Sequence, residues 1–189
     1  MTIQHNLITD PNIHEPKGVS SAAIGKVYVA DGAGSGDWVY PSGYVHGEIY
    51  IDEGATAQTL PAASAYAKLN PTGEWTQGVV KVIIASPSTG EMTFPEAGDY
   101  KLCFWCRFST ASLASGTEYN FKYAIDGSTS SRTLSASKIS NGSDKLLVNA
   151  VGIASVTAGQ VLSMYVGGDA TSSSTDITIL EAGLSAIKL

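Results

Sequence analysis

The chain has 189 residues with only 15% charged, and its 17 acidic side chains outnumber its 11 basic ones. This length suits one domain with an appendage, and a domain of about 140 to 150 residues buries enough surface to fold without a metal or a disulfide. The pI of about 4.9 opposes binding of nucleic acid or anionic lipid, and we expect neither a membrane span nor a secretory signal, since no apolar run is long enough.

Residues 1 to 45 are predicted to form an extended arm, because they contain three prolines and show no sustained period of 2 or 3.6. The best strand of this arm is 26 to 30, and a Gly/Ser-rich loop at 31 to 37 separates it from Trp38, so this part is expected to form a small hairpin or to dock on a neighbouring surface. The loop lacks the G-K-[S/T] ending of a phosphate-binding loop. A flexible linker is favoured over a calcium site built from its two aspartates.

The arm has too few apolar residues to form a core of its own, so we expect it to become ordered on a partner. Aliphatic and aromatic side chains dominate the energetically important parts of interfaces. The alternative is that several of these side chains pack back on the chain's own folded domain. The predicted anchors are Ile8, Ile13, Val19, Val27, Val29 and Trp38.

From residue 46 the sequence becomes a series of short strands separated by turn residues, which predicts an all-β, antiparallel two-sheet sandwich over 46 to 189. Only 62 to 69 is compatible with a helix, and two turns are short for one. The expected strands are 47–51, 74–85, 91–94, 100–109, 118–126, 132–137, 145–155, 160–166 and 175–189.

The expected strand at 100 to 109 is the most informative one. Residues i and i+3 of a strand point to opposite faces and lie about 10 Å apart, so Cys103 and Cys106 are predicted to be free thiols and not a disulfide or a zinc site. Alternate residues of this strand are aromatic or apolar and are expected to line the core. They are Tyr100, Leu102, Phe104, Cys106 and Phe108.

Catalytic signatures are weak. His46-x-Glu48 upstream of the Cys-x-x-Cys is similar to the zinc deaminase signature, but Leu102 replaces its proline and both parts lie in strand-like sequence. All three histidines lie in or next to the arm, and no Ser-His-acid arrangement can be read from them. We therefore expect no enzymatic activity, no metal and no cofactor.

Two expected strands, around 79 to 84 and 146 to 153, are apolar on both faces. A sandwich core buries only one face of each sheet, and exposed apolar patches favour association. We therefore predict a homotrimer. The alternative is a strand order that hides more of this apolar surface.

Residues 94 to 104 read FPEAGDYKLCF and resemble the F-x(3)-G-x-Y-x-[F/L]-x-F core of the jelly rolls shared by tumour necrosis factor and the complement-type globular heads. Residues 144 to 166 resemble a hairpin of the same family, with Gln160 where an aspartate is common, and 176 to 189 resemble its closing strand. The likeness covers about 46 to 189 and implies a jelly roll that forms trimers.

The arm carries a second resemblance. Residues 5 to 19 (HNLITDPNIHEPKGV) and 27 to 38 (VYVADGAGSGDW) resemble segments of tailed-bacteriophage virion proteins, where they precede the G-x-I-Y-I-D-x-G opening found here at 47 to 54. This implies a structural protein on the capsid surface: a capsid decoration, or cement, protein whose arm binds the major capsid protein. It would be made in the cytoplasm of the host bacterium.

The alternative function is adhesion, with the jelly roll as the knob of a tail fibre or head fibre that binds a host glycan or protein. Aromatic rings stack on sugars, although aromatic residues in strands more often belong to a core. An arm that starts at Met1 without a fibre shaft favours decoration. The candidate stacking residues are Trp75, Trp105, Tyr119 and Tyr123.

Overall fold

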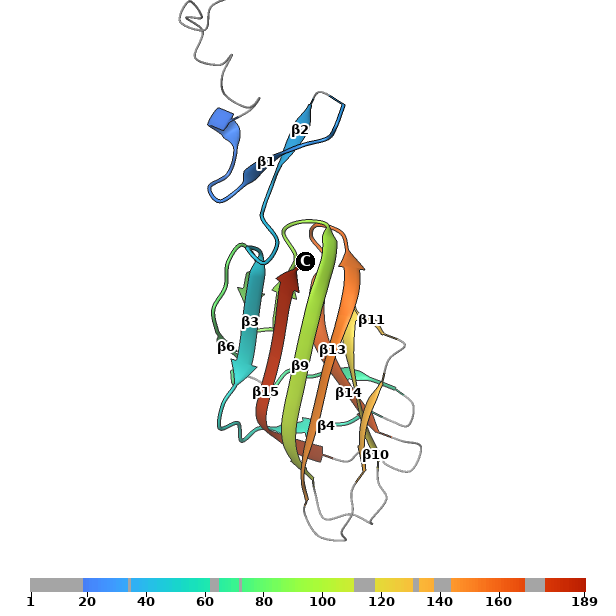
Figure 1. Cartoon of the computed structure of the whole chain (residues 1–189). Coiled ribbons are helices and arrows are strands. Elements are labelled where there is room, and N and C mark those ends of the chain that lie inside the picture. Colours follow the sequence, from blue (N-terminus) through green and yellow to red (C-terminus); the bar gives the residue numbers. More distant parts are fainter. Residues whose placement is uncertain are drawn as a thin grey trace, which may run out of the picture. The chain divides into compact units, whose positions relative to one another are not determined.

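The computed structural model describes residues 19–33, 35–61, 65–71, 73–110, 118–130, 133–137, 144–168 and 176–189 (Figure 1). The chain divides into two compact units, Met1–Tyr44 and Val45–Leu189. No helix in the described parts has the length and apolar character needed to cross a bilayer.

The N-terminal unit contains a 3-10 turn, η3 (Val19–Ser21), and a hairpin of β1 (Val27–Ala30) and β2 (Gly36–Val39). The predicted hairpin is confirmed. Tyr28 and Trp38 are cross-strand partners, and their rings meet edge to face at 5.4 Å. Such pairs stabilise a hairpin beyond the area that they bury.

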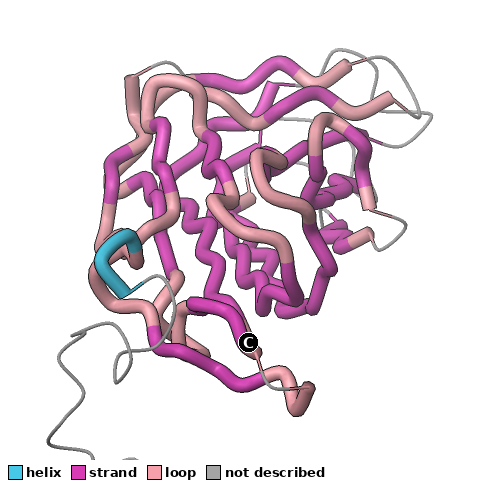
Figure 2. Tube along the Cα trace, turned by 90° about the horizontal axis from the view of Figure 1, so that it is seen from above, coloured by secondary structure: helices cyan, strands magenta, loops and turns pink. Residues whose placement is uncertain are grey.

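The C-terminal unit is a sandwich of two antiparallel sheets (Figures 1 and 2). The first sheet has the order β13 (Lys145–Val156), β9 (Gly98–Thr110), β15 (Asp176–Lys188), β3 (His46–Ile51) and β6 (Thr76–Gln77), with β4 (Ala57–Thr59) paired to β15. The second has the order β11 (Ser128–Thr129), β10 (Glu118–Ile125), β14 (Val161–Gly168), β8 (Glu91–Thr93) and β7 (Ile84–Ser86), with β12 (Leu134–Ser137) paired to β10 and β5 (Ala67–Lys68) to β14.

The core lies between the sheets and is centred on β9. Its five predicted core residues are all buried, which confirms the period-two pattern. Phe108 of the first sheet meets Phe121 of the second at 5.1 Å between ring centroids, and it meets Tyr119 at 5.4 Å. At the other end of β9, Tyr100 packs on Phe94 at 4.6 Å. Aromatic contacts across the two sheets therefore hold the sandwich together.

The predicted strand 74–85 is wrong as a single element. The chain first forms β6 in the first sheet. An isolated bridge between His46 and Lys81 then makes a second contact with that sheet, after which the chain enters the second sheet as β7. The crossing takes place at Val82, whose φ of 71° lies in the left-handed region that β-branched residues rarely occupy. The apolar residues on both faces of this segment therefore come from a change of sheet.

The described part of 62–69 also does not form the helix with which its sequence is compatible. Ala67–Lys68 forms β5, which pairs with Val166 and Tyr165 of β14. Residues 62–64 lie outside the described residues. This segment pairs with the part of β14 that lies beyond its pairing with β8, where the backbone groups of both gain partners.

Candidate association surfaces

The outward face of β13 carries three large apolar side chains. Leu147, Val151 and Ile153 are 59%, 63% and 61% exposed, while Val148 between them is buried. The prediction that this strand is apolar on both faces is confirmed. Because β13 ends the strand order of its sheet, the apolar row lies along an edge of the sandwich, and we call it the β13 patch.

Beside the β13 patch, the outer surface of the first sheet is flattened by a close contact between an indole and a glycine. Trp105 of β9 is paired with Gly183 of β15, and a Cβ atom at Gly183 would lie 2.3 Å from Trp105 Nε1. One step along the strands, Arg107 donates to Glu181 Oε1 at 2.7 Å. The surface is thus apolar toward β13 and has its ion pair at one end.

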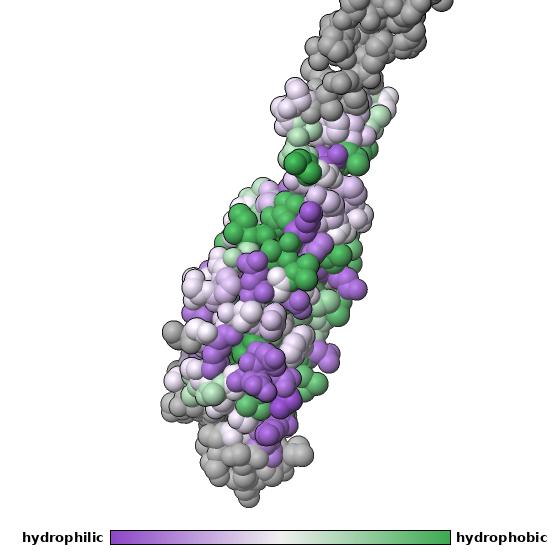
Figure 3. Space-filling view, turned by 90° about the vertical axis from the view of Figure 1, so that its left-hand side faces the viewer, coloured by the Kyte–Doolittle hydropathy of each residue, from purple (hydrophilic) through white to green (hydrophobic). Residues whose placement is uncertain are grey.

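A second apolar patch lies at the opposite edge of the sandwich, where β6 and β7 end their sheets. Val79 is 72% exposed and Ile84 is 58% exposed. Figure 3 shows hydrophobic residues gathered on the side of the jelly roll where β3 and β6 lie. We call Val79 and Ile84 the β7 patch.

The N-terminal unit exposes the apolar residues of β1. Val27 and Val29 are 45% and 49% exposed, whereas Trp38 is half-buried against Tyr28. The remaining predicted anchors are not placed together by the structure: Val19 begins η3, and Ile8 and Ile13 lie outside the described residues.

A tyrosine stack follows the hairpin in the same unit. Tyr40 and Tyr44 stack at 5.0 Å with nearly parallel rings, and Lys26 Nζ lies 5.0 Å from the centroid of Tyr40. Gly25 is required beneath Tyr44, because a Cβ there would lie 2.1 Å from the tyrosine hydroxyl oxygen. This second packed cluster fixes the start of the hairpin.

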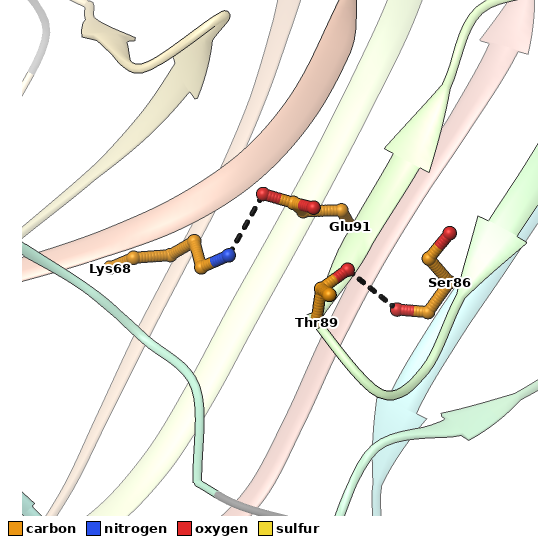
Figure 4. Close-up of polar contacts among 4 residues, drawn as sticks. All are labelled: Lys68, Ser86, Thr89 and Glu91. Atoms are coloured by element: carbon orange, nitrogen blue, oxygen red, sulfur yellow. Dashed lines mark hydrogen bonds and ion pairs between the residues drawn. The ribbon is translucent and has the colours of Figure 1, made fainter.

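The second sheet carries a group of polar contacts around β5, β8 and the turn that precedes β8 (Figure 4). Lys68 donates to Glu91 Oε1 at 2.8 Å, and in the adjacent turn the Thr89 hydroxyl donates to the Ser86 carbonyl at 3.2 Å. Burial alone would raise the pKa of Glu91, but the hydrogen bonds from Lys68 and Thr89 and the charge of Lys68 outweigh it and lower that pKa. Lys122 Nζ also lies 4.5 Å from the centroid of the Tyr66 ring.

Two of the four candidate sugar-stacking residues cannot present a ring to a ligand. Trp75 is 5% exposed and Tyr119 is fully buried. Trp105 is half-buried on the outer face of the first sheet, and Tyr123 lines a cavity. The proposed set is therefore wrong as a single stacking surface.

The cysteines behave as the strand geometry predicted. Cys103 and Cys106 are free thiols, the first half-buried on the outer face of β9 and the second buried in the core. Burial raises the pKa of Cys106 and keeps its thiol protonated at neutral pH, so it is a poor nucleophile and metal ligand.

Among the residues that the structure describes, no group of three or more His, Cys, Asp or Glu could hold a metal ion. In the Gly/Ser-rich loop of the hairpin, Asp31 Oδ1 accepts from the amides of Ala33 and Ser35 at 2.7 and 3.0 Å. These two bonds lower the pKa of Asp31. The loop is thus held by its own aspartate. The absence of enzymatic activity stays a prediction.

Comparison with known proteins addresses the fold. No family model matches the sequence, and no curated protein sequence matches it. Eiger TNF from S. frugiperda superposes with a TM-score of 0.53 over 77% of this chain and 92% of its own, at 9% identity. The chain has a tumour necrosis factor-like jelly-roll fold.

Two further structures resemble this jelly roll more distantly. The globular domain of zebrafish complement 1qA protein gives a TM-score of 0.49 over 77% of this chain and 97% of its own, at 12% identity. Murine APRIL gives 0.45 over 76% and 99%, at 9% identity. The predicted all-β, two-sheet fold class is confirmed, and the low identities confine the likeness to the fold.

The sequence did not reveal the contact between Trp105 and Gly183. Their pairing depends on a shift of register between Ile179 and Glu181 of β15, and a one-residue shift changes which side chains share a face. The available signal is the glycine itself, since a glycine within a strand often marks a close approach.

Proposed function

We propose that this chain is a structural virion protein of a tailed bacteriophage: a homotrimeric capsid decoration protein with a jelly-roll knob and an N-terminal anchor. The observation that carries the proposal is the difference in apolar burial between its two units. The jelly roll has a complete aromatic core, whereas the hairpin leaves Val27 and Val29 largely exposed. The resemblance of the arm to virion-protein segments supports placing this unit on the major capsid protein.

The anchor works by strand addition. An isolated two-stranded hairpin is marginally stable in water, and β1 and β2 form such a sheet. A capsid strand that pairs with the hairpin edge gives it a third strand and covers Val27 and Val29. Three hairpins on one trimer raise the effective concentration of each further contact, so weak individual contacts give firm attachment.

The two apolar patches of the jelly roll favour a closed ring of copies. The β13 patch and the β7 patch differ in sequence and lie at opposite edges of the sandwich. Contact between two different patches is head-to-tail, and such contacts build a ring when the rotation closes. Three copies agree with the sequence resemblance to trimeric jelly rolls.

Attachment is tested by co-sedimentation with phage heads depleted of this protein, and separately with host cells. We compare the full chain, a chain starting at His46, the variant Val27→Ser/Val29→Ser and, as a matched control, Leu189→Ser, which changes an exposed apolar side chain of the jelly roll outside both patches. We expect only the full chain and the control to pellet with heads. Pelleting of all four with cells would establish the adhesin alternative, and head binding by the chain starting at His46 would remove the anchor from the hairpin.

Assembly is tested by light scattering at micromolar concentration. We expect a trimer for the full chain and a monomer for Leu147→Asp/Ile153→Asp, because the new charges would be buried without partners. Thr129→Asp, at an exposed position of β11, is the control and stays trimeric. A monomeric full chain would exclude the proposed ring.

A further inference from the structure

A cavity of about 340 Å³ lies inside the jelly roll near its β12–β13 edge. It is bounded by both sheets, since β9 and β13 belong to the first and β10 and β12 to the second. Nothing in the proposed virion role uses it. The lining residues are Leu102, Phe104, Tyr123, Thr133, Leu134, Ala150, Val151 and Gly152.

The cavity results from small inward-facing residues in β13. The inward positions of this strand change from Val148 to Ala150, Gly152 and Ala154 and return to Val156. Ala150 and Gly152 are paired with Phe104 and Leu102, the two β9 residues that line the cavity. Protein interiors hold few voids larger than a water molecule, so this run of small residues opens a space that larger side chains would fill.

The lining selects against charged ligands. Of the eight lining residues that the structure describes, none is charged, and only Tyr123 and Thr133 carry a hydroxyl. A charged group would lose its hydration there without a compensating partner. An apolar cavity of about 150 Å³ stays dry and binds benzene, so a cavity of this size holds an apolar body of about two rings.

The cavity is reached from the solvent along β13. Val151 lines the cavity and is 63% exposed. Val151 and Gly152 also line an outer hollow of about 360 Å³ beside Lys101 and Ile153. At Gly152 no side chain separates the two spaces, so in a chain that is not yet assembled a ligand can enter beside the edge strand without unfolding the sandwich.

We propose that this cavity is a binding site for a small, uncharged, largely apolar molecule about the size of two fused or linked rings. Its apolar body packs between Phe104, Leu134 and the small residues of β13. A single polar group on the ligand pairs with the hydroxyl of Tyr123 or Thr133. All of the lining residues belong to the jelly roll and none to the hairpin, and Val151 is shared with the β13 patch.

The probe for this site is 6-propionyl-2-(dimethylamino)naphthalene, which is uncharged, has two fused rings, and changes the colour and intensity of its fluorescence once it leaves water. We expect saturable binding to the full-length protein with one site per chain. Ala150→Leu places a side chain in the cavity and is expected to weaken binding at least tenfold. Leu189→Ser removes an exposed apolar side chain that does not line the cavity and is expected to leave binding unchanged.

Methyl NMR of the full-length protein locates the probe without relying on a variant. We expect the Leu102 and Leu134 methyl signals to shift on titration and those of Leu147 to stay in place. Non-saturable fluorescence, or shifts confined to Leu147, would overturn the proposal. It would equally be overturned if Ala150→Leu changed the mass measured by light scattering, since the cavity would then receive a neighbouring copy and not a small molecule.

Discussion

The hairpin and the jelly roll use aromatic residues in different ways. In the hairpin, Tyr28 and Trp38 cover one face of two strands, and the opposite face leaves Val27 and Val29 exposed. In the jelly roll, a group of aromatic residues that includes Phe108, Tyr119 and Phe121 lies between the two sheets and is fully buried. A unit with one covered face depends on a partner for its stability, whereas a unit with two facing sheets does not.

The largest expected effect comes from the core. Phe108→Ala removes a ring that packs on Tyr119 and Phe121, and we expect the free energy of unfolding to fall by about 3 to 5 kcal/mol. Chemical denaturation measures this loss. Hydrogen exchange of the β1 and β2 amides should remain unchanged, and faster exchange there would show that the two units are not independent.

Two ion pairs of the jelly roll should differ in strength. Lys188 and Glu96 are joined at 2.9 Å with side chains 17% and 19% exposed, while Arg107 and Glu181 are 41% and 34% exposed. We expect Glu96→Gln to cost about 1 to 2 kcal/mol and Glu181→Gln less than about 1 kcal/mol, because solvent screens the exposed pair. Equal losses in denaturation would contradict this ranking.

The same variant has a spectroscopic signature. Burial, together with the negative charge of Glu96, raises the pKa of Tyr100 to about 12. Because Glu96→Gln removes that charge, the Tyr100 hydroxyl should ionise at lower pH. Ultraviolet titration of tyrosine ionisation measures the change, and Glu181→Gln, which does not face Tyr100 in this way, is the control.

Acid should weaken the jelly roll through its hydrogen-bonded carboxylates. Burial alone would raise the pKa of Glu74, but hydrogen bonds from Thr56 and the backbone of Ala55 outweigh it and lower that pKa from 4.5, and the pKa of Glu91 is also lowered. A carboxylate whose pKa is lowered by folding stabilises the fold fully above about pH 4.5. This stabilisation is lost as the pH falls through the pKa of the carboxylate in the folded state. Denaturation at pH 7 and pH 3 should show a smaller difference for Glu74→Gln and Glu91→Gln than for the unchanged chain.

A small and local effect is expected in the hairpin. Tyr28→Ala removes the ring that packs on Trp38, and we expect a local loss of about 0.5 to 1.5 kcal/mol. Hydrogen exchange of the β1 and β2 amides should become faster, whereas the denaturation midpoint of the jelly roll stays the same. A shifted midpoint would mean that the hairpin contributes to global stability.

Sequence periodicity predicted the fold well where a strand stays in one sheet and turns one face to the core. In β9, alternate residues from Tyr100 to Phe108 are buried as expected, and the two cysteines lie on opposite faces. The hairpin was predictable for a similar reason, since a Gly/Ser loop separates two short apolar runs. The local pattern is sufficient in these places because the apolar residues alternate with the period of two at which strand side chains change faces.

Periodicity failed where the chain changes partners. The sequence of 74–85 predicts one apolar strand, yet the chain passes from the first sheet to the second at Val82. A valine gives no sequence signal for a φ of 71°, because β-branched residues rarely adopt it. The cavity was missed for the opposite reason. Ala150 and Gly152 read as ordinary strand residues, and only the facing side chains of β9 show that they leave a space.

The position of β15 constrains the order of events during synthesis. This strand is the last in the chain, yet it lies between β9 and β3 in the middle of the first sheet (Figure 1). Until residues 176–188 leave the ribosome, β9 and β3 each have an open edge toward the missing strand, and the nascent chain cannot close its sandwich. The jelly roll can therefore close only after β15 has been synthesised, and chaperones that shield strand edges should have their greatest effect before that point.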